Sequence, residues 1–278
     1  MRWSIVCAIL SISMLSLVPD LTAQDSIFPD KALEAVVRNY VFEKRNNDQP
    51  IVEDDVVNIS TIEGKGKGIK DLTGLEKCRS LALLHLPGNE ITKIDAIAGL
   101  KNIQSLDLSK NQISDIKPIE DLKKLQYVLV TNNQIAGLSA VSGLDNLMVL
   151  DVSNNQVQDL APLADLKKVH SLYVADNQIT DIKPLASMHK LDTLDLSGNQ
   201  VADLSPLKGF EKWTFLFLEK NKITDLGVLV ESAKAANAKP DRSASFWKVY
   251  LTGNPLSDAA KGPQLEELKK QTKLVDFK

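Results

Sequence analysis

The sequence predicts an α/β solenoid, in which short parallel strands stack into a sheet on the concave face and 3₁₀ or extended segments form the convex face. The first observation is an asparagine that recurs every 22 residues, at Asn89, Asn111, Asn133, Asn155, Asn177, Asn199 and Asn221. The second is that the residues three, five and eight places before each of these asparagines are apolar. The third is that both ends of the chain depart from the pattern, as the caps of a repeat protein must.

Each repeat is expected to contain one short strand and one asparagine with a structural role. Side chains alternate between the faces of a strand, so the apolar residues three and five places before the asparagine indicate one buried face. Apolar residues two and five places after the asparagine fill the other side of the coil. A carboxamide has both donors and an acceptor, so we expect the stacked asparagines to satisfy backbone groups of neighbouring turns.

The convex side is predicted to hold 3₁₀ or extended segments in place of long helices. Proline lacks a backbone N–H and disrupts a helix interior, and four repeats carry one seven places after the asparagine: Pro118, Pro162, Pro184 and Pro206. Five repeats carry an aspartate four places after the asparagine, a residue type that caps turns: Asp115, Asp159, Asp181, Asp203 and Asp225.

The chain divides into five segments. Residues 1–23 are interpreted as a signal peptide, 24–58 as a helical N-terminal cap, 59–230 as the repeats, 231–245 as an insertion, and 246–278 as a final repeat with a C-terminal cap. In the N-terminal cap, Asp30 is the expected N-cap of a helix with an apolar stripe of Leu33, Val36, Val37 and Tyr40. A second short helix is expected over residues 52–57, and Ile59, Ile62 and Ile69 indicate a degenerate first coil.

The period breaks near the C-terminus. Asn254 follows Asn221 by 33 residues, so 11 residues are inserted, and the Ala/Lys-rich stretch 231–245 is expected to leave the coil as a helical or mobile excursion on the convex side. The apolar spacing is expected to resume at Phe246, Val249, Leu251 and Asn254. Ser257 is the expected cap of a last helix over residues 258–271, and residues 274–277 indicate a terminal strand.

Residues 1–23 predict a cleaved export signal. Arg2 gives a short positive region, and the apolar run Ile5–Val18 is shorter than the ~20 residues that a spanning helix needs. The run is followed by a small residue, so cleavage is expected near Ala23. The alternative is an uncleaved membrane anchor. An exported mature chain, periplasmic or secreted and without a membrane span, follows from the first interpretation.

Charge and cysteine content argue against nucleic acid or an anionic membrane as a partner and against an internal disulfide bond. The formal net charge is −3 and cleavage removes one Arg and one Asp, so nothing in the balance indicates binding to nucleic acid or an anionic membrane. Cleavage also removes Cys7 and leaves Cys78 alone, so no internal disulfide is expected. Cys78 occupies the repeat position held elsewhere by Leu100 and Leu122, which favours a buried thiol over a reactive one.

The repeated phrase L-x-x-L-x-L-x-x-N-x-I/V/L is the leucine-rich repeat, and its continuation I-x-D-I/L-x-P-L is similar to the bacterial internalin type. The stretches 27–30 (IFPD) and 68–75 (GIKDLTGL) resemble the cap that precedes such repeats, so the resemblance covers most of residues 27–256. It implies a curved solenoid with a concave parallel sheet and a protein-binding role. The sequence shows no immunoglobulin-like domain, wall-anchoring motif or cell-wall-binding repeat, so a host-invasion or adhesin role is not implied.

The candidate binding surface is the concave face, where the strand residues between the buried ones point outward. We expect Phe215, Phe217 and Tyr250, with Tyr173 two strands away, to form one exposed aromatic patch, because adjacent strands lie roughly 4.8 Å apart. Exposed aromatic residues on a rigid sheet are the usual anchors of protein interfaces. The predicted partner-binding residues are Tyr127, Leu129, Asp151, Tyr173, Asp195, Phe215, Phe217 and Tyr250.

The predicted function is an exported, non-catalytic scaffold, monomeric, that binds a protein on this face. Other occupants of the patch are the 231–245 insertion, the C-terminal cap, or a second copy of the chain. A self-associating envelope protein and a glycan-binding module, in which the aromatic faces stack on sugar rings, are the alternative functions.

No enzyme, metal site or cofactor is predicted. Asp107, Asp151 and Asp195 alternate along the concave face, so neighbouring members are about 10 Å apart by the strand spacing, whereas Ca²⁺ needs oxygens at about 2.3–2.6 Å. The same separation is marginal for a glycosidase pair. The three histidines fall at different places in their repeats and are not expected to cluster, and no nucleophile elbow or phosphate loop is present.

Overall fold

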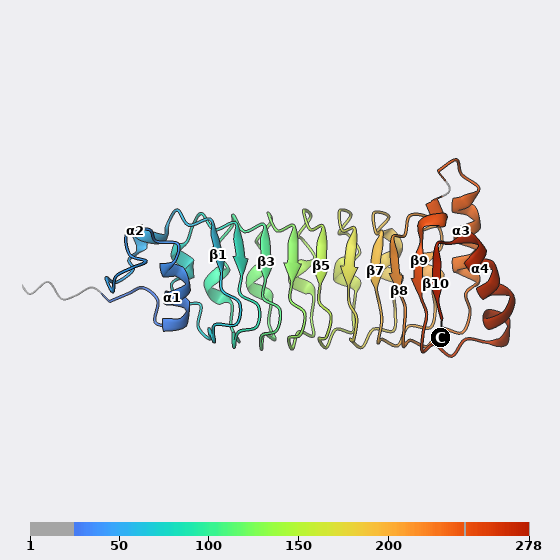
Figure 1. Cartoon of the computed structure of the whole chain (residues 1–278), viewed down its shortest axis with the longest axis horizontal. Coiled ribbons are helices and arrows are strands. Elements are labelled where there is room, and N and C mark those ends of the chain that lie inside the picture. Colours follow the sequence, from blue (N-terminus) through green and yellow to red (C-terminus); the bar gives the residue numbers. More distant parts are fainter. Residues whose placement is uncertain (1–24, 242, 278) are drawn as a thin grey trace, which may run out of the picture.

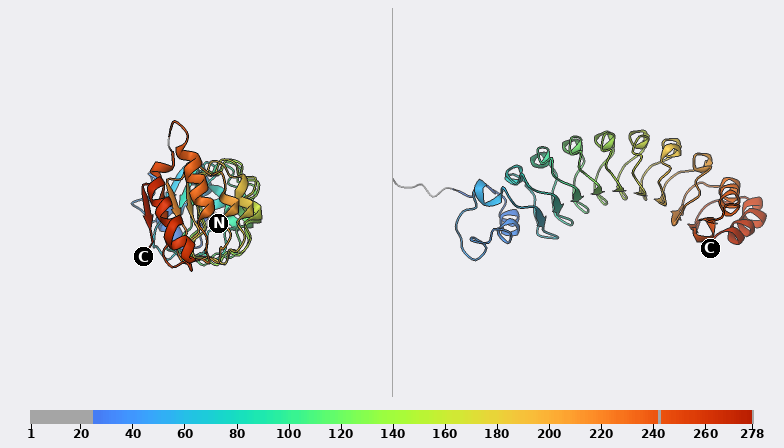
Figure 2. Two further views of the ribbon diagram at one scale, coloured as in Figure 1. Left: turned by 90° about the vertical axis from the view of Figure 1, so that its right-hand side faces the viewer. Right: turned by 90° about the horizontal axis from the view of Figure 1, so that it is seen from above.

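The computed structural model describes residues 25–241 and 243–277, and the expected signal peptide lies outside the described residues. The described chain is elongated (Figure 1), and the view from above in the right panel of Figure 2 shows that it forms an arch. Ten parallel strands form a single sheet whose spatial order is the order along the chain, which confirms the predicted solenoid. The strands line the inner curve of the arch and the short helical turns line the outer curve (Figure 2).

Every strand has three residues, of which the middle one is buried in the first nine. The bounds are β1 Thr61–Glu63, β2 Leu83–His85, β3 Ser105–Asp107, β4 Tyr127–Leu129, β5 Val149–Asp151, β6 Ser171–Tyr173, β7 Thr193–Asp195, β8 Phe215–Phe217, β9 Lys248–Tyr250 and β10 Leu274–Asp276. Each residue pairs with the equivalent residue of the next coil, as Leu129 does with Asp151 and Asp151 with Tyr173. The register is therefore the sequence repeat itself.

The convex face consists of 3₁₀ turns, as predicted. Their bounds are η1 Leu75–Lys77, η2 Asp95–Ile97, η3 Lys117–Ile119, η4 Ser139–Val141, η5 Ala161–Leu163, η6 Lys183–Ser187 and η7 Ser205–Leu207. Each of the five predicted turn-capping aspartates accepts a hydrogen bond from the backbone N–H two residues later; Asp159, for example, accepts from Ala161 N at 2.8 Å. The prolines that follow four of these aspartates lie in the first turn of a 3₁₀ segment, where the backbone N–H would have no partner within the turn.

The repeat asparagines form a hydrogen-bonded ladder along the interior. Asn155 Oδ1 accepts from Ile135 N at 2.9 Å, while its Nδ2 donates to Val130 O and Val152 O, both at 3.0 Å. The first and second of these partners belong to the preceding coil. The same pattern runs from Asn89 to Asn254, so it continues across the inserted residues.

The residue before each ladder asparagine adopts a left-handed backbone conformation. Its φ is +54° at Asn154 and +68° at Gly198, and Lys110, Asn132, Asp176, Lys220, Gly88 and Gly253 share the sign. Glycine enters this region without steric cost, and asparagine and aspartate tolerate it better than most residues. This turn is what swings each asparagine side chain back into the coil.

The N-terminal cap is two helices, α1 Lys31–Arg38 and α2 Glu53–Val56. Asp30 caps α1 as predicted, with Oδ1 accepting from Ala32 N and Leu33 N, and its Oδ2 accepts from Lys70 N and Asp71 N in the first coil. One carboxylate therefore starts the helix and attaches it to the solenoid. Burial opposes its ionisation, but the four N–H donors together hold the Asp30 pKa below its usual value.

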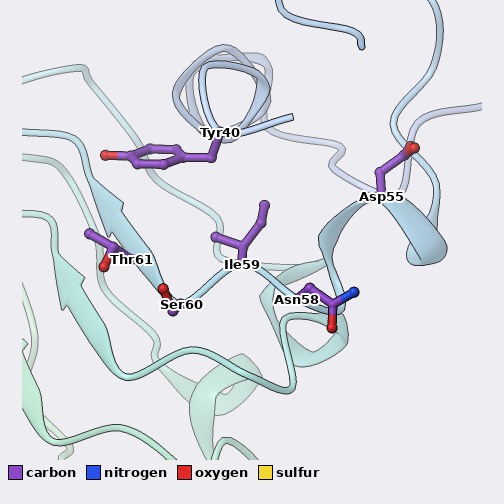
Figure 3. Close-up of a pocket in the computed structure, with 6 residues that line it drawn as sticks. All are labelled: Tyr40, Asp55, Asn58, Ile59, Ser60 and Thr61. Atoms are coloured by element: carbon purple, nitrogen blue, oxygen red, sulfur yellow. The ribbon is translucent and has the colours of Figure 1, made fainter. Parts of the chain in front are cut away.

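A hollow of about 310 Å³ between the cap and β1 is lined by Tyr40, Asp55, Asn58, Ile59, Ser60 and Thr61 (Figure 3). The Tyr40 ring lies across the strand, and its hydroxyl accepts a hydrogen bond from Glu63 N at 2.9 Å. Asp55 forms an ion pair with Lys44 at 2.6 Å. The Glu63 N–H of the edge strand is thus engaged within the chain, and the Tyr40 ring covers part of this edge against further pairing.

The inserted segment lies on the convex side. Helix α3, Gly227–Asn237, begins before the predicted insertion, and a 3₁₀ turn, η8 Ser243–Phe246, follows it. The expected return of the apolar spacing at Phe246 is wrong by one residue: Phe246 is 64% exposed and Trp247 is fully buried in its place. The η8 turn ends at Phe246, so the buried residue is one place closer to the ladder asparagine than in the other coils, and the Trp247 indole N–H donates to Glu211 O at 3.1 Å.

The C-terminal cap consists of a π-helical turn, η9 Ala260–Gln264, that continues into α4, Leu265–Gln271, and then β10. Ser257 Oγ accepts from Ala260 N at 3.2 Å at the start of this helix. Leu265 and Leu268 close the apolar interior at this end. Helical caps thus cover both ends of the solenoid (Figure 1).

Cys78 is fully buried among the apolar residues, which confirms the buried thiol. Burial, with a smaller contribution from the charge of Glu76, raises the pKa of Cys78 to about 12. A thiol in this state is not a nucleophile at neutral pH.

Replacing a ladder asparagine tests the account of the interior. We expect Asn155→Ala to lower the free energy of unfolding by about 1–3 kcal/mol, because backbone groups of two coils lose their partners. The adjacent exposed Gln156→Ala is the control and should change it by less than about 0.5 kcal/mol. Chemical denaturation of the three proteins measures both values, and equal midpoints would contradict the ladder account.

Replacing Asp30 tests the attachment of the N-terminal cap. We expect Asp30→Ala to cost about 1–2 kcal/mol at neutral pH, the usual value of a helix N-cap. Because the folded-state pKa lies below the unfolded one, this stability is present above the unfolded pKa and is lost as the pH falls through the folded pKa. Thermal melts over an acidic pH series should therefore show the two proteins converging; a constant difference would argue against a charge contribution.

Candidate functional site

The concave face presents two rows of outward side chains, one from the first and one from the third residue of each strand. The predicted site residues come from β4 to β9, and Leu129, Asp151, Tyr173, Asp195, Phe217 and Tyr250 follow one another in the row of third residues. Tyr127 and Phe215 belong to the other row. The predicted site residues therefore extend over six neighbouring strands of the sheet.

Three of these residues form a compact group, which we call the aromatic cluster: Phe215, Phe217 and Tyr250. The Phe215 and Phe217 rings are 5.7 Å apart and within 3° of parallel, and the Phe217 and Tyr250 rings are 4.7 Å apart at 19°. Lys248 lies over the Phe215 ring, with Nζ 4.4 Å from the centroid. All three rings are partly exposed. The cluster thus offers a preformed apolar surface that needs little ordering on binding.

Tyr173 and Tyr127 lie outside the aromatic cluster. Strand β7, with Asp195 at the equivalent position, separates Tyr173 from Phe217, and no ring contact joins them within the described residues. Burial raises the pKa of Tyr173; Asp151, Asp192 and Asp195 raise it further, while a hydrogen bond with Ser171 opposes the shift. Tyr127, two strands further on, is 38% exposed. The single predicted patch is therefore a cluster of three rings followed by two separate tyrosines.

The concave aspartates have a structural role that sequence reasoning missed. Asp107, Asp151 and Asp195 each accept a hydrogen bond at 2.9–3.0 Å from the backbone N–H of the serine two residues later. The sequence pattern that could have predicted this role is the repeated D-x-S at the strand end, which is typical of a local turn. At least one carboxylate oxygen of each is therefore committed to the fold.

Asp195 carries an uncompensated charge. Burial raises its pKa, Glu219 and Asp151 raise it further, and the hydrogen bonds from Ser197 oppose the shift. Among the described residues no Lys, Arg or His forms an ion pair with it.

The inserted segment does not occupy the aromatic cluster. Helix α3 packs against η7, η8, η9 and α4, which lie on the convex side and at the C-terminal end (Figure 2). Residues of β10 adjoin the cluster through the pairing of Tyr250 with Asp276.

Two of the three histidines line one groove, although they lie at different places in their repeats. His170 and His189 line the same groove of about 560 Å³ at the edge of the solenoid, with Lys168, Lys190, Lys212 and Asp192 among its other residues. The residues before one strand and those before the next lie side by side in adjacent coils, which the distance along the sequence does not reveal. His189 also contacts the Phe210 ring, with centroids 5.9 Å apart.

No group of three or more His, Cys, Asp or Glu side chains that would hold a metal ion occurs in the described part of the chain. Likewise, no helix within residues 25–241 and 243–277 combines the length and apolarity needed to cross a bilayer.

A family model described as leucine rich repeats (2 copies) matches residues 79–124, 101–146, 145–187, 167–209 and 189–231, together more than half of the chain. A comparison with curated protein sequences found no significant match. Among solved structures, internalin C2 from Listeria monocytogenes is 28% identical, with a TM-score of 0.65 over 91% of this chain and 95% of that one.

Two more distant structures share the fold. The functional domain of InlJ from Listeria monocytogenes is 19% identical, with a TM-score of 0.50 over 92% of this chain and 63% of that one. A leucine-rich-repeat protein from Leptospira interrogans is 21% identical, with a TM-score of 0.54 over 73% of this chain and 62% of that one.

The electrostatics of Asp195 give a stability prediction. Because its folded-state pKa is raised, the ionised form destabilises the fold, so Asp195→Asn should raise the melting temperature at neutral pH. The native protein takes up a proton at Asp195 before the unfolded chain does, so the advantage should shrink as the pH falls through the raised pKa. Asp203→Asn is the control. Backbone and side-chain hydrogen bonds from Ser205 lower the Asp203 pKa, so removing this charge should not raise the melting temperature. Thermal melts check both, and a destabilised Asp195→Asn would contradict the assignment.

Proposed function

Because this chain belongs to the leucine-rich-repeat family, whose internalin-type members are non-enzymatic scaffolds for protein interaction, we propose that it is an exported scaffold that binds a protein on its concave face. The observation that carries the proposal is the aromatic cluster beside the unpaired Asp195. Concave sheets of solenoids form extended binding surfaces, and aromatic anchors supply most of the energy of many interfaces.

The chemistry of the surface defines what the partner presents. An apolar or aromatic side chain covers Phe215, Phe217 and Tyr250, and a Lys or Arg reaches Asp195 in the adjacent strand. Asp151 offers a second acidic position two strands away, beyond Tyr173. Tyr127 and Leu129 extend the contact along the arch as mixed apolar and hydrogen-bonding surface. The alternation of acidic and aromatic positions gives selectivity for a partner with basic and apolar residues at matching spacing.

Export rests on residues 1–23 alone, whose positive start, apolar run and small residue at Ala23 are typical of a signal peptide. After cleavage the chain keeps one cysteine, Cys78, which is fully buried and so protected in an oxidising compartment. Amino-terminal sequencing of the protein recovered from the producing organism checks this part: a start near Gln24 supports export, and an intact Met1 contradicts it.

Loss of the aromatic cluster should abolish partner capture. We expect mature residues 24–278, immobilised and exposed to envelope and secreted fractions of the source organism, to retain a protein that the Phe215→Ala/Phe217→Ala/Tyr250→Ala variant does not retain. The rings are partly exposed, so circular dichroism should show an unchanged fold in the variant. Phe42→Ala, which removes an aromatic side chain that is 74% exposed on the N-terminal cap, is the control and should retain the partner.

Equal retention by the triple variant would place the site elsewhere. No retained protein, with self-association of the wild type alone, would favour a structural role.

If the captured partner contacts Asp195 through a basic side chain, Asp195→Asn should weaken binding by about tenfold or more while stabilising the free chain. Opposite effects of one substitution on binding and on stability would distinguish a binding role from a structural one.

A further inference from the structure

A row of lysines follows one edge of the solenoid, away from the concave face. Lys168, Lys190 and Lys212 each stand nine residues before a ladder asparagine, so they occupy the same place in three consecutive coils. All three are exposed and line the groove of about 560 Å³ that also contains His170 and His189.

These lysines are not neutralised within the described residues. Lys168 donates to the Asn146 side-chain oxygen at 2.7 Å, and no carboxylate lies within ion-pair distance of Lys168, Lys190 or Lys212. The one carboxylate that lines this groove, Asp192, accepts a hydrogen bond from the Thr193 hydroxyl at 2.9 Å. The groove therefore presents a net positive surface on a chain whose overall charge is −3.

A second cavity continues the groove toward the C-terminal end. It measures about 360 Å³, shares Lys212 and Thr214 with the first, and is also lined by Trp213, Asp241, Ser243 and Phe246. Two buried side-chain polar atoms of the described residues lack a hydrogen-bond partner, Trp213 Nε1 and Ser243 Oγ, and both residues line this cavity. An indole N–H is a donor only, and a buried donor without an acceptor is costly.

We propose that the two cavities form one site for an acidic peptide segment, independent of the concave face. Its carboxylates pair with Lys168, Lys190 and Lys212. Its backbone supplies the carbonyl acceptor that Trp213 lacks, and an apolar side chain covers Phe246, which is 64% exposed.

A peptide fits this site better than a uniform polyanion. Asp192 lines the groove and Asp241 lines the second cavity, and both repel a ligand that is negative at every position. A peptide with spaced carboxylates avoids them and offers N–H donors to them. Met148, which is partly exposed in the groove, adds apolar surface that a polyphosphate chain would not use.

The test uses a fluorescein-labelled peptide, Glu-Gly-Glu-Gly-Glu-Gly-Leu-Phe, titrated with the mature chain and followed by fluorescence anisotropy. We expect saturable binding that weakens with salt and is lost when the three Glu are replaced by Gln. Lys168→Gln/Lys190→Gln/Lys212→Gln should lose about tenfold in affinity or more. Lys65→Gln/Lys93→Gln/Lys261→Gln makes the same change in charge at exposed positions outside the groove and should bind as the wild type does.

The indole N–H gives a readout that does not depend on substitution. In ¹H–¹⁵N spectra the Trp213 indole resonance should move when the peptide binds. The Trp247 indole resonance should not move, because its N–H already donates to Glu211 O at 3.1 Å.

Equal affinity of the two lysine triple variants, or an unmoved Trp213 resonance at saturation, would overturn the proposal. Lysine-dependent binding of inorganic polyphosphate without binding of the peptide would overturn the choice of ligand. The triple variant of the aromatic cluster should bind the peptide normally, which keeps this test separate from that of the concave face.

Discussion

The structure depends on the carboxamide of one residue per coil. Each ladder asparagine joins the backbone of its own turn to that of the preceding coil through its donors and its acceptor. Groups that would be costly to bury unpaired are satisfied in this way, and the spacing between coils is fixed by hydrogen-bond length. The three-residue strands are too short to align themselves by pairing alone, so the ladder also sets the sheet register. The backbone that carries the concave side chains is thus held by hydrogen bonds from within the coil.

The surfaces differ in charge according to their place on the coil. The third residue of each strand from β5 to β9 is aromatic or acidic. The segments that precede strands β6, β7 and β8 carry the lysines instead. Residues at the same position of successive repeats lie in one continuous row on the surface. A few substitutions at one repeat position therefore determine the charge of a whole edge of the solenoid. A solenoid can therefore hold surfaces of opposite charge close together without changing its core.

Sequence reasoning was most successful where the repeat supplies the same observation many times. The ladder, the convex aspartates such as Asp159, and the buried Cys78 were all predicted because equivalent residues in other coils share their environment. It failed at the entry to the last coil, where Trp247 is buried in place of Phe246 although β9 itself pairs in the expected register. It also missed which side chains of neighbouring coils line the same groove. His170 and His189 line one groove although neither their spacing nor their types indicate it. The ring geometry of the aromatic cluster depends on side-chain rotamers, which no repeat pattern specifies.

The eleven additional residues between β8 and β9 leave the sheet intact, since Phe217 still pairs with Tyr250 and Asn254 still completes the ladder. Lengthening a surface connection has a small entropic cost when its two ends remain fixed. The outer arc at α3 and η8 is therefore a natural point of entry for foreign sequence. A fluorescent reporter or an affinity tag placed there would lie on the side opposite the sheet, and the molecule would carry it with its inner surface unchanged.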